Sequence, residues 1–307
     1  MRRYLLRRVL LLIPVVLGVA TAVFFIIHLV PGDPIEIMLG EQARAADRER
    51  LRKTLGLDRP VLEQYVRFLG GLAKGDLGQS LHHRRGVAGL VLERLPATLE
   101  LGAAAMAIAL AVALPLGILA AARARSWLDH GSMVSSLLGV SIPNFWLGPM
   151  LIALFSLRLN WLPPSGRGGI EHLILPALTL GTSLAAILAR MTRASLLEAL
   201  PRDFVRTARA KGLAEWAVLV RHGLRNALLP VVTAAGLQTS AVLSGSVITE
   251  SIFAWPGIGR LTIEAIAARD YPLVQGCVLA IALTYVALNL ITDVVYTLCD
   301  PRVRYES

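Results

Sequence analysis

The stretch Ala97–Ala122 reads ATLELGAAAMAIALAVALPLGILAAA, and Glu100 is its only charged residue. A helix that crosses the hydrocarbon core of a bilayer needs about 20 apolar residues, because it rises about 1.5 Å per residue across a thickness of about 30 Å. The whole chain has the same character: 55% of its 307 residues are hydrophobic, 17% are charged, and the mean hydropathy is +0.62. These values favour a membrane protein over a chain of two soluble domains.

Further apolar runs lie before and after this one, and together they predict an all-α, polytopic membrane protein with six transmembrane helices. The expected spans are roughly Val9–Val30, Ala97–Ala122, Met133–Leu157, Leu173–Met191, Ala227–Ile248 and Val274–Leu298. The first run follows four arginines and could be read as a signal peptide. Its apolar length of about 22 residues exceeds the roughly 7–15 residues of such a peptide's apolar region, so we expect a retained first span.

The distribution of basic residues predicts the orientation. With the N-terminus inside, the short inner segments carry 16 Arg and Lys residues against 4 in the two short outer loops. Cytoplasmic loops carry an excess of positive charge, so both termini are expected inside. The same distribution explains the formal net charge of +10 without nucleic acid as a partner.

A long segment, about Pro31–Pro96, is expected outside the membrane between the first two spans. Its eleven basic and nine acidic residues nearly cancel, and a loop of this length crosses largely regardless of charge. Glu41–Leu55 and, after Pro60, Val61–Leu72 are expected to be helical. The expected organisation is a cytoplasmic N-terminus with the first span (1–30), an extracytoplasmic loop domain (31–96), membrane helices two to six (97–298) with a cytoplasmic loop at about 192–226, and a cytoplasmic tail (299–307).

The cytoplasmic loop holds the most informative pattern, from Asp203 to Pro230. Arg206, Arg209, Ala210 and Leu213 recur at helical spacing, which predicts that they share one face of a short helix. Gly212 can end that helix without a steric cost. The pattern alone fits two structures equally well, an interfacial amphipathic helix on anionic lipid and a basic tip that docks on a partner.

Arg206-Thr-Ala-Arg-Ala-Lys-Gly-Leu213 followed by Arg225-Asn-Ala-Leu-Leu-Pro230 resembles the ATPase-contacting loop of binding-protein-dependent ABC import permeases. The likeness is to the first-permease type of the dipeptide/oligopeptide/nickel branch, and it extends over the whole chain. The other matching phrases are Val30-Pro-Gly-Asp-Pro34, Leu55-Gly-Leu-Asp58, Gly75-Asp-Leu-Gly78, Ser141-Ile-Pro-Asn-Phe-Trp146, Ile252-Phe-Ala-Trp-Pro-Gly-Ile-Gly-Arg260 and Asp300-Pro-Arg302.

The resemblance implies a coupling helix formed by Arg206, Thr207, Ala208, Arg209, Ala210, Lys211, Gly212 and Leu213. It also implies the partners: a second homologous permease subunit, two ATP-binding cassette ATPases, an extracytoplasmic solute-binding protein and the lipid of a bacterial inner membrane. ATP and Mg²⁺ would be bound by those ATPases, since this sequence has no phosphate-binding G-x-x-x-x-G-K-[S/T] loop and we expect no cofactor in it. Arg206-Thr207-Ala208 stands where the general importer motif has Glu-Ala-Ala, so no Glu contact is carried over.

Polar residues inside the expected spans are candidates for the solute path, because they are costly in a membrane and usually face a cavity or a partner. We expect Asn144, beside Pro143, and Glu250 to border that path. No group of residues has metal-ligand spacing, so His82-His83 is interpreted as a solvated loop pair. Cys277 and Cys299 are interpreted as packing residues. The tryptophans Trp127, Trp161 and Trp255 are expected at the membrane interfaces.

The solute is not identified by the sequence. Di- or oligopeptides are the leading candidates, with nickel, a metal chelate or glutathione as alternatives in the same family. A secondary transporter would show internal repeats and midplane charges. An intramembrane hydrolase would need a nucleophile and a base within the bundle. Neither pattern is evident, so we expect a transport subunit and not an enzyme.

Overall fold

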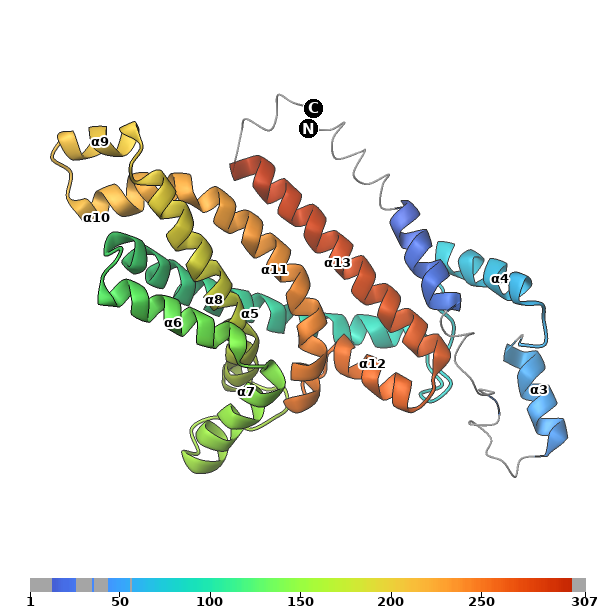
Figure 1. Cartoon of the computed structure of the whole chain (residues 1–307). Coiled ribbons are helices and arrows are strands. Elements are labelled where there is room, and N and C mark those ends of the chain that lie inside the picture. Colours follow the sequence, from blue (N-terminus) through green and yellow to red (C-terminus); the bar gives the residue numbers. More distant parts are fainter. Residues whose placement is uncertain (1–12, 26–34, 36–43, 56, 300–307) are drawn as a thin grey trace. The chain divides into compact units, whose positions relative to one another are not determined.

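A computed structural model describes residues 13–25, 35, 44–55 and 57–299 (Figure 1). The described residues form helices and no β-strand, with one isolated bridge between Gln79 and Gly86. This confirms the all-α class. The helices are Ile13–Phe25, α3 (Ala45–Leu55), α4 (Val61–Ala73), α5 (Val87–Ala122), α6 (Trp127–Ser141), α7 (Asn144–Leu151), the π-helix η1 (Ile152–Arg158), α8 (Ile170–Ala199), α9 (Asp203–Ala210), α10 (Glu215–Ala217), the π-helix η2 (Val218–Leu224), α11 (Arg225–Ile252), α12 (Ile258–Ala267) and α13 (Tyr271–Cys299).

The chain divides into two compact units. The first comprises residues 1–96 and 257–286, and the second comprises residues 97–256 and 287–307. Helices α5 and α13 each contribute to both units. This grouping differs from the single membrane core expected at 97–298, because residues 257–286 pack with the N-terminal third of the chain.

The first unit has its core where the start of α5 meets α12 and the first half of α13. Val87, Leu261, Leu273 and Cys277 are among its buried residues. Cys277 is fully buried there, which agrees with its interpretation as a packing residue. The expected helices of the long loop are present as α3 and α4, and α4 begins directly after Pro60.

The second unit is built around α8, which packs against α6 and α11 (Figure 1). Its core is rich in alanine, including Ala105, Ala109 and Ala113 on successive turns of α5. Small residues let helix backbones approach closely, which is the usual basis of association inside membranes. At Gly117 a Cβ atom would lie only 2.6 Å from the Cβ of Thr192, so α5 and α8 can meet there only without a side chain.

The third expected span is not one continuous helix. Helix α6 ends at Ser141, α7 begins at Asn144, and the two parts are bent by 99° at the break. Pro143 causes this interruption, because a proline disfavours helical backbone at the residue before it. Ile142 accordingly has φ −81° and ψ 117°, and Pro143 itself has ψ 140°.

Three described helices are long and apolar enough to cross a membrane, or four if the bent pair is one span. They are Val87–Ala122, Ile170–Ala199 and Tyr271–Val295, with Trp127–Ser141 and Asn144–Arg158 as the bent pair. Helix α11 has 28 residues and is not among the spans identified in the part of the chain that the structure describes. Of the first expected span only the helix Ile13–Phe25 lies among the described residues. The count of six spans and the orientation therefore remain predictions.

Two expected boundaries are moved by the structure. Helix α5 begins at Val87 and continues through Pro96, so the expected border between loop and span lies inside a helix. The segment after α11 was expected to be an outer loop, and it contains the ten-residue helix α12.

Candidate functional site: the loop between α8 and α11

Helix α9 starts and ends at residues that suit a short, isolated helix. Asp203 places a negative charge in the first turn, where the helix dipole favours it. At the other end, the N–H of Gly212 donates to the carbonyl of Arg209 at 2.9 Å, and Gly212 has a φ of +76°. A Cβ at Gly212 would meet no atom within 4 Å. Glycine is therefore favoured here by the backbone conformation and not by lack of space.

One side of α9 packs onto the chain itself. Val205 and Ala208 are buried together with Val218 of η2, and Leu200 covers the cluster. Ala208 is one of the residues of the expected coupling helix, and its side chain contacts this chain's own core. This packing holds α9 to the helix that leads into α11.

The other side of α9 and the turn after it are exposed. This surface, called the tip below, comprises Arg206, Thr207, Arg209, Ala210, Lys211, Gly212 and Leu213. The expectation that Leu213 continues the helical face is wrong, because α9 ends at Ala210 and the left-handed Gly212 turns the chain. Leu213 is 42% exposed beyond that turn.

An ion pair braces the tip. The Arg209 guanidinium donates to both carboxylate oxygens of Glu215, at 2.6 and 3.1 Å. The hydrogen bond from Arg209 lowers the pKa of Glu215 below its ordinary value, and the same bond raises the pKa of Arg209. Because both groups are exposed to water, such a pair contributes only about 0–1 kcal/mol. Its main effect is to fix where the Arg209 side chain points.

Two residues of this region were missed in the sequence. Glu215 is six residues from Arg209, outside the i+3 and i+4 spacings that helical patterns reveal. Trp216 follows it and is 61% exposed, an unusual position for so large an apolar side chain. A charged residue next to a tryptophan, three residues after Gly212, was the available signal.

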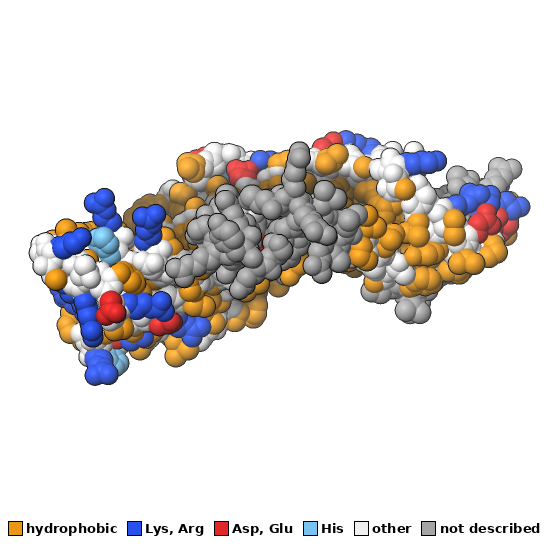
Figure 2. Space-filling model, turned by 90° about the horizontal axis from the view of Figure 1, so that it is seen from above, with side chains coloured by type: hydrophobic (Ala, Val, Ile, Leu, Met, Phe, Trp, Pro, Cys, Tyr) orange, Lys and Arg blue, Asp and Glu red, His pale blue; other side chains and the backbone are white. Residues whose placement is uncertain are grey.

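The end of the second unit that carries α9 and α10 is strongly basic. Figure 2 shows Lys and Arg side chains gathered at that end. The exposed basic residues of the loop are Arg202, Arg206, Arg209, Lys211, Arg221 and Arg225. This surface can attract an acidic partner or anionic lipid, and its charges can form strong hydrogen bonds to carboxylates.

A second ion pair anchors the start of the loop. The Asp129 carboxylate, near the start of α6, accepts two hydrogen bonds from Arg193 of α8, at 2.5 and 2.7 Å, and one from the Arg125 backbone at 2.9 Å. Asp129 is 3% exposed. This contact ties α6 to α8 just before α8 leads into the loop.

The two residues expected in the solute path lie on different elements of the second unit. Asn144 is half-buried at the start of α7, and its amide lies near Gly245 of α11. Glu250 is completely buried and accepts a hydrogen bond from Thr98 at 2.7 Å. The structure encloses that carboxylate between α5 and α11, and a role for either residue in a path stays a prediction.

Trp255, expected at a membrane interface, is buried inside the second unit. Its side chain is 1% exposed, and its Nε1–H donates to the carbonyl of Ala97 at 2.8 Å. A buried indole usually finds such a partner for its N–H. Trp127 and Trp161 are 79% and 69% exposed, as their assignment to the interfaces requires.

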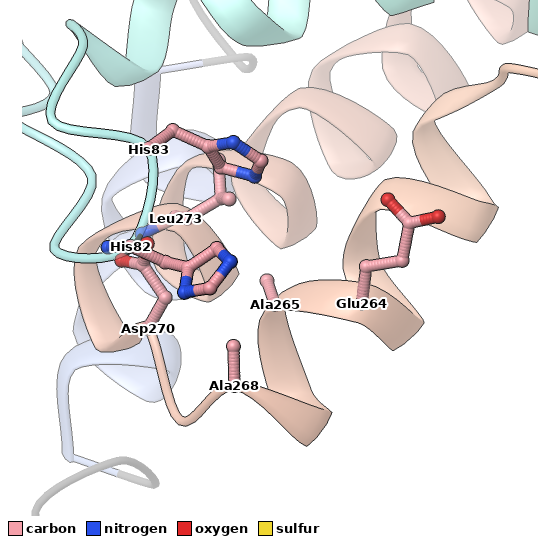
Figure 3. A pocket seen from close by; sticks show the side chains of 7 residues that line it. All are labelled: His82, His83, Glu264, Ala265, Ala268, Asp270 and Leu273. Atoms are coloured by element: carbon pink, nitrogen blue, oxygen red, sulfur yellow. Dashed lines mark hydrogen bonds between the residues drawn. The ribbon is translucent and has the colours of Figure 1, made fainter. Parts of the chain in front are cut away.

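A separate hollow lies in the first unit, beside the pair His82-His83 (Figure 3). Both histidines are exposed and project toward α12. The buried Asp270 carboxylate holds their loop, since it accepts from the Ser80 hydroxyl and from the His82 N–H. Among the described residues no group of three or more His, Cys, Asp or Glu could hold a metal ion.

Two family models match the sequence over most of its length. Residues 113–305 match the binding-protein-dependent transport system inner membrane component, and residues 1–102 match the N-terminal membrane component of the same systems.

Characterised relatives match the chain from end to end, and each comparison covers all of both proteins. The chain is 44% identical to the di/tripeptide transport system permease protein DppB of Pseudomonas aeruginosa (strain UCBPP-PA14). It is 42% identical to the glutathione transport system permease protein GsiC and 42% identical to the dipeptide transport system permease protein DppB, both of Escherichia coli (strain K12).

Solved structures of ABC transporters share the fold. An inward-facing form of the MetNI methionine ABC transporter matches with a TM-score of 0.58 at 20% identity, over 69% of this chain and 96% of that one. An amino acid ABC transporter crystallised with histidines matches with a TM-score of 0.51 at 18% identity, over 70% of this chain and 94% of that one.

Proposed function

The chain belongs to the family of inner membrane components of binding-protein-dependent transport systems, and we propose that it forms part of the path by which an ABC importer takes up di- or oligopeptides. It is a multi-pass membrane protein and a transport permease subunit. We place it in a bacterial cytoplasmic membrane with six spans, both termini inside and the 31–96 segment outside.

The choice of peptides rests on the relatives. Their names specify di- and tripeptides, dipeptides and glutathione, which is itself a tripeptide. A peptide backbone is thus the chemical feature that these solutes share. Glutathione is the alternative solute that a relative's name supports, and nickel and metal chelates are the alternatives expected from the resemblance alone.

The proposed assembly has a second homologous permease, two ATPase subunits that bind ATP and Mg²⁺, and an extracytoplasmic solute-binding protein. The tip docks on one ATPase and transmits its closure through α8 and α11. The single observation that supports this best is the exposed, basic tip on a helix whose opposite side is fastened to the chain's own core. A helix held in this way moves together with the spans that it connects.

The test introduces a negative charge at the tip. Ala210→Asp places a carboxylate where a small, exposed side chain is proposed to meet the ATPase. Ala124→Asp, which is also exposed but lies between α5 and α6, is the matched control. In proteoliposomes containing the whole complex and the loaded binding protein, Ala210→Asp should abolish solute-stimulated ATP hydrolysis and peptide uptake. The control should retain both.

A second pair of variants tests the turn. Gly212→Val forces a β-branched residue into a left-handed backbone, at a cost of about 1–2 kcal/mol, whereas Gly212→Asn tolerates it. Val should uncouple transport and Asn should preserve it. Normal coupling in both Ala210→Asp and Gly212→Val, at normal assembly, would remove the support for the tip. Uptake driven by an ion gradient without ATP would instead favour a secondary transporter.

A further inference from the structure

Helix α4 is amphipathic along its whole length. Its apolar arc includes Tyr65 and Phe68 on one edge and Leu62 and Val66 on the other. The polar side carries Glu63 and Arg67. With 13 residues the helix is too short to cross a bilayer, which needs about 20. A helix with this pattern is suited to lie along a surface, with one side in an apolar medium.

One edge of the apolar arc packs against the helix Ile13–Phe25. The ring of Tyr65 lies 5.3 Å from that of Phe24, and the ring of Phe68 lies 5.6 Å from it. The hydroxyls of Tyr65 and Thr21 form a hydrogen bond of 2.6 Å. Helix α4 is therefore fixed to the last two turns of Ile13–Phe25.

The other edge is uncovered. Leu62 is 73% exposed and Val66 is 62% exposed. The neighbouring helix Ile13–Phe25 likewise exposes apolar side chains, Ile13, Val15, Leu17 and Phe25 among them. Ile13–Phe25 belongs to the first expected span, where lipid is the surrounding medium, and the uncovered edge of α4 continues its exposed apolar surface.

The place where α4 attaches to the helix Ile13–Phe25 specifies how deep α4 lies in the membrane. This step rests on the proposed orientation, in which Ile13–Phe25 runs from the inside to the outside. Its last turns, and with them α4, then lie at the outer face of the membrane. Arg67 and Arg59 flank Glu63 on the polar side, with Arg67 at 3.3 Å from its carboxylate. Arginines at this level can reach lipid phosphates while their stems cover apolar surface.

From this geometry we propose that α4 is an interfacial helix: Leu62 and Val66 insert into the outer leaflet, and Arg59 and Arg67 face the headgroups. The helix then anchors the extracytoplasmic loop at a fixed height beside the first span. The occupant of the exposed edge is lipid, and neither a second subunit nor the binding protein.

The test uses spin labels on the two sides of α4 in the complete complex, in membranes of phosphatidylethanolamine and phosphatidylglycerol. Leu62→Cys and Val66→Cys report the apolar edge, and Glu63→Cys and Arg67→Cys are matched controls one residue away. The background variants Cys277→Ala and Cys299→Ala remove the native thiols. Labels at 62 and 66 should collide mainly with dissolved oxygen, at a depth of about 5–10 Å. Labels at 63 and 67 should collide mainly with a water-soluble nickel chelate.

Two outcomes would overturn the proposal. Access of the chelate to positions 62 and 66 equal to that at 63 would mean that the edge faces water. Protection of 62 and 66 from both reagents would mean that a protein covers it. Solute-stimulated ATP hydrolysis by the same labelled complexes tests the proposed function separately, so that either idea can fail without the other.

Discussion

The Arg209–Glu215 ion pair can be detected by titration, because it changes the pKa of the Glu215 carboxyl. The bond from Arg209 holds the pKa of Glu215 below its ordinary value of 4.5. A carboxyl whose pKa is lower in the folded than in the unfolded chain stabilises the folded tip at any pH above its pKa in the unfolded chain. This contribution is lost as the pH falls through the pKa that the carboxyl has in the folded chain. For this exposed pair the contribution is at most about 1 kcal/mol.

We predict that the fluorine resonance of fluorinated Trp216 titrates with the pKa of its neighbour Glu215. The midpoint should lie below pH 4.5 in the wild type and should move up toward that value in Arg209→Gln. Trp216→Phe assigns the resonance. Arg206→Gln is the control, since Arg206 pairs with Asp203 at 3.7 Å and not with Glu215. An unchanged midpoint in Arg209→Gln would show that the pair does not form in solution.

For single residues, contacts within one helical turn could be predicted from the sequence, and contacts between residues far apart in the chain could not. Gly212 was predicted to end its helix, because glycine in that position is a signal within one turn of chain. The Asp129–Arg193 pair joins residues 64 positions apart, and the Trp255 contact to Ala97 joins residues 158 apart. No periodicity in one sequence reports such pairs, so the burial of Trp255 could not be predicted.

At the scale of elements, the contact between α5 and α8 depends on one missing side chain. A Cβ at Gly117 would lie 2.6 Å from Thr192 and 2.8 Å from the carbonyl of Ala189, and the latter is backbone that cannot turn away. Gly102, also in α5, is a matched comparison, because its Cβ would lie at an ordinary 3.5 Å from Val242.

We predict that Gly117→Ala destabilises the protein by about 1–3 kcal/mol through overpacking. Gly102→Ala should be neutral or slightly stabilising, because alanine has the higher helix propensity. The measurement is the thermal unfolding midpoint of each variant in the same detergent, and Gly117→Ala should have the lower one. Equal midpoints would mean that α5 and α8 separate at no cost and that their close approach is not important for stability.

Helices with a long apolar run or clear turn residues at their ends could be predicted from the sequence, and breaks within helices were harder to predict. Helices α3, α4, α8 and α13 lie close to their expected positions, since apolar length and turn residues specify them. The break between α6 and α7 follows from Pro143, but the 99° bend depends on the packing of α7 against α8 and α11. Helix α12 was hidden in a short segment that was expected to be a loop.

At the scale of the whole molecule, the grouping of 257–286 with 1–96 could not be predicted, because it depends on long-range packing between α12, α13 and the start of α5. Membership of the family was predictable, because its phrases are spread along the chain in order. The number of membrane spans could be predicted only in part. Apolar length identifies some spans directly, and the bent pair and α11 are the two ambiguous ones.

We predict that both ambiguous elements cross the membrane. Lys211→Cys, at the tip, should react with an impermeant maleimide only from the cytoplasmic side. Ser165→Cys, between η1 and α8, should react only from outside if the bent pair spans. Ala268→Cys, directly after α12, should react only from outside if α11 spans. All three side chains are exposed, so a lack of reaction from one side reports the membrane and not burial.

Each failure has its own meaning in this experiment. Reaction of Ser165→Cys from the cytoplasmic side would make α6 and α7 a re-entrant hairpin, and the inside-out order of all later helices would change with it. Reaction of Ala268→Cys from that side would leave α11 within the cytoplasmic half and place Glu250 away from any path. Lys74→Cys, at the end of α4, is the reference for the outer face, because the four arginines before the first expected span predict an N-terminus inside and this loop outside, whichever of the later helices cross.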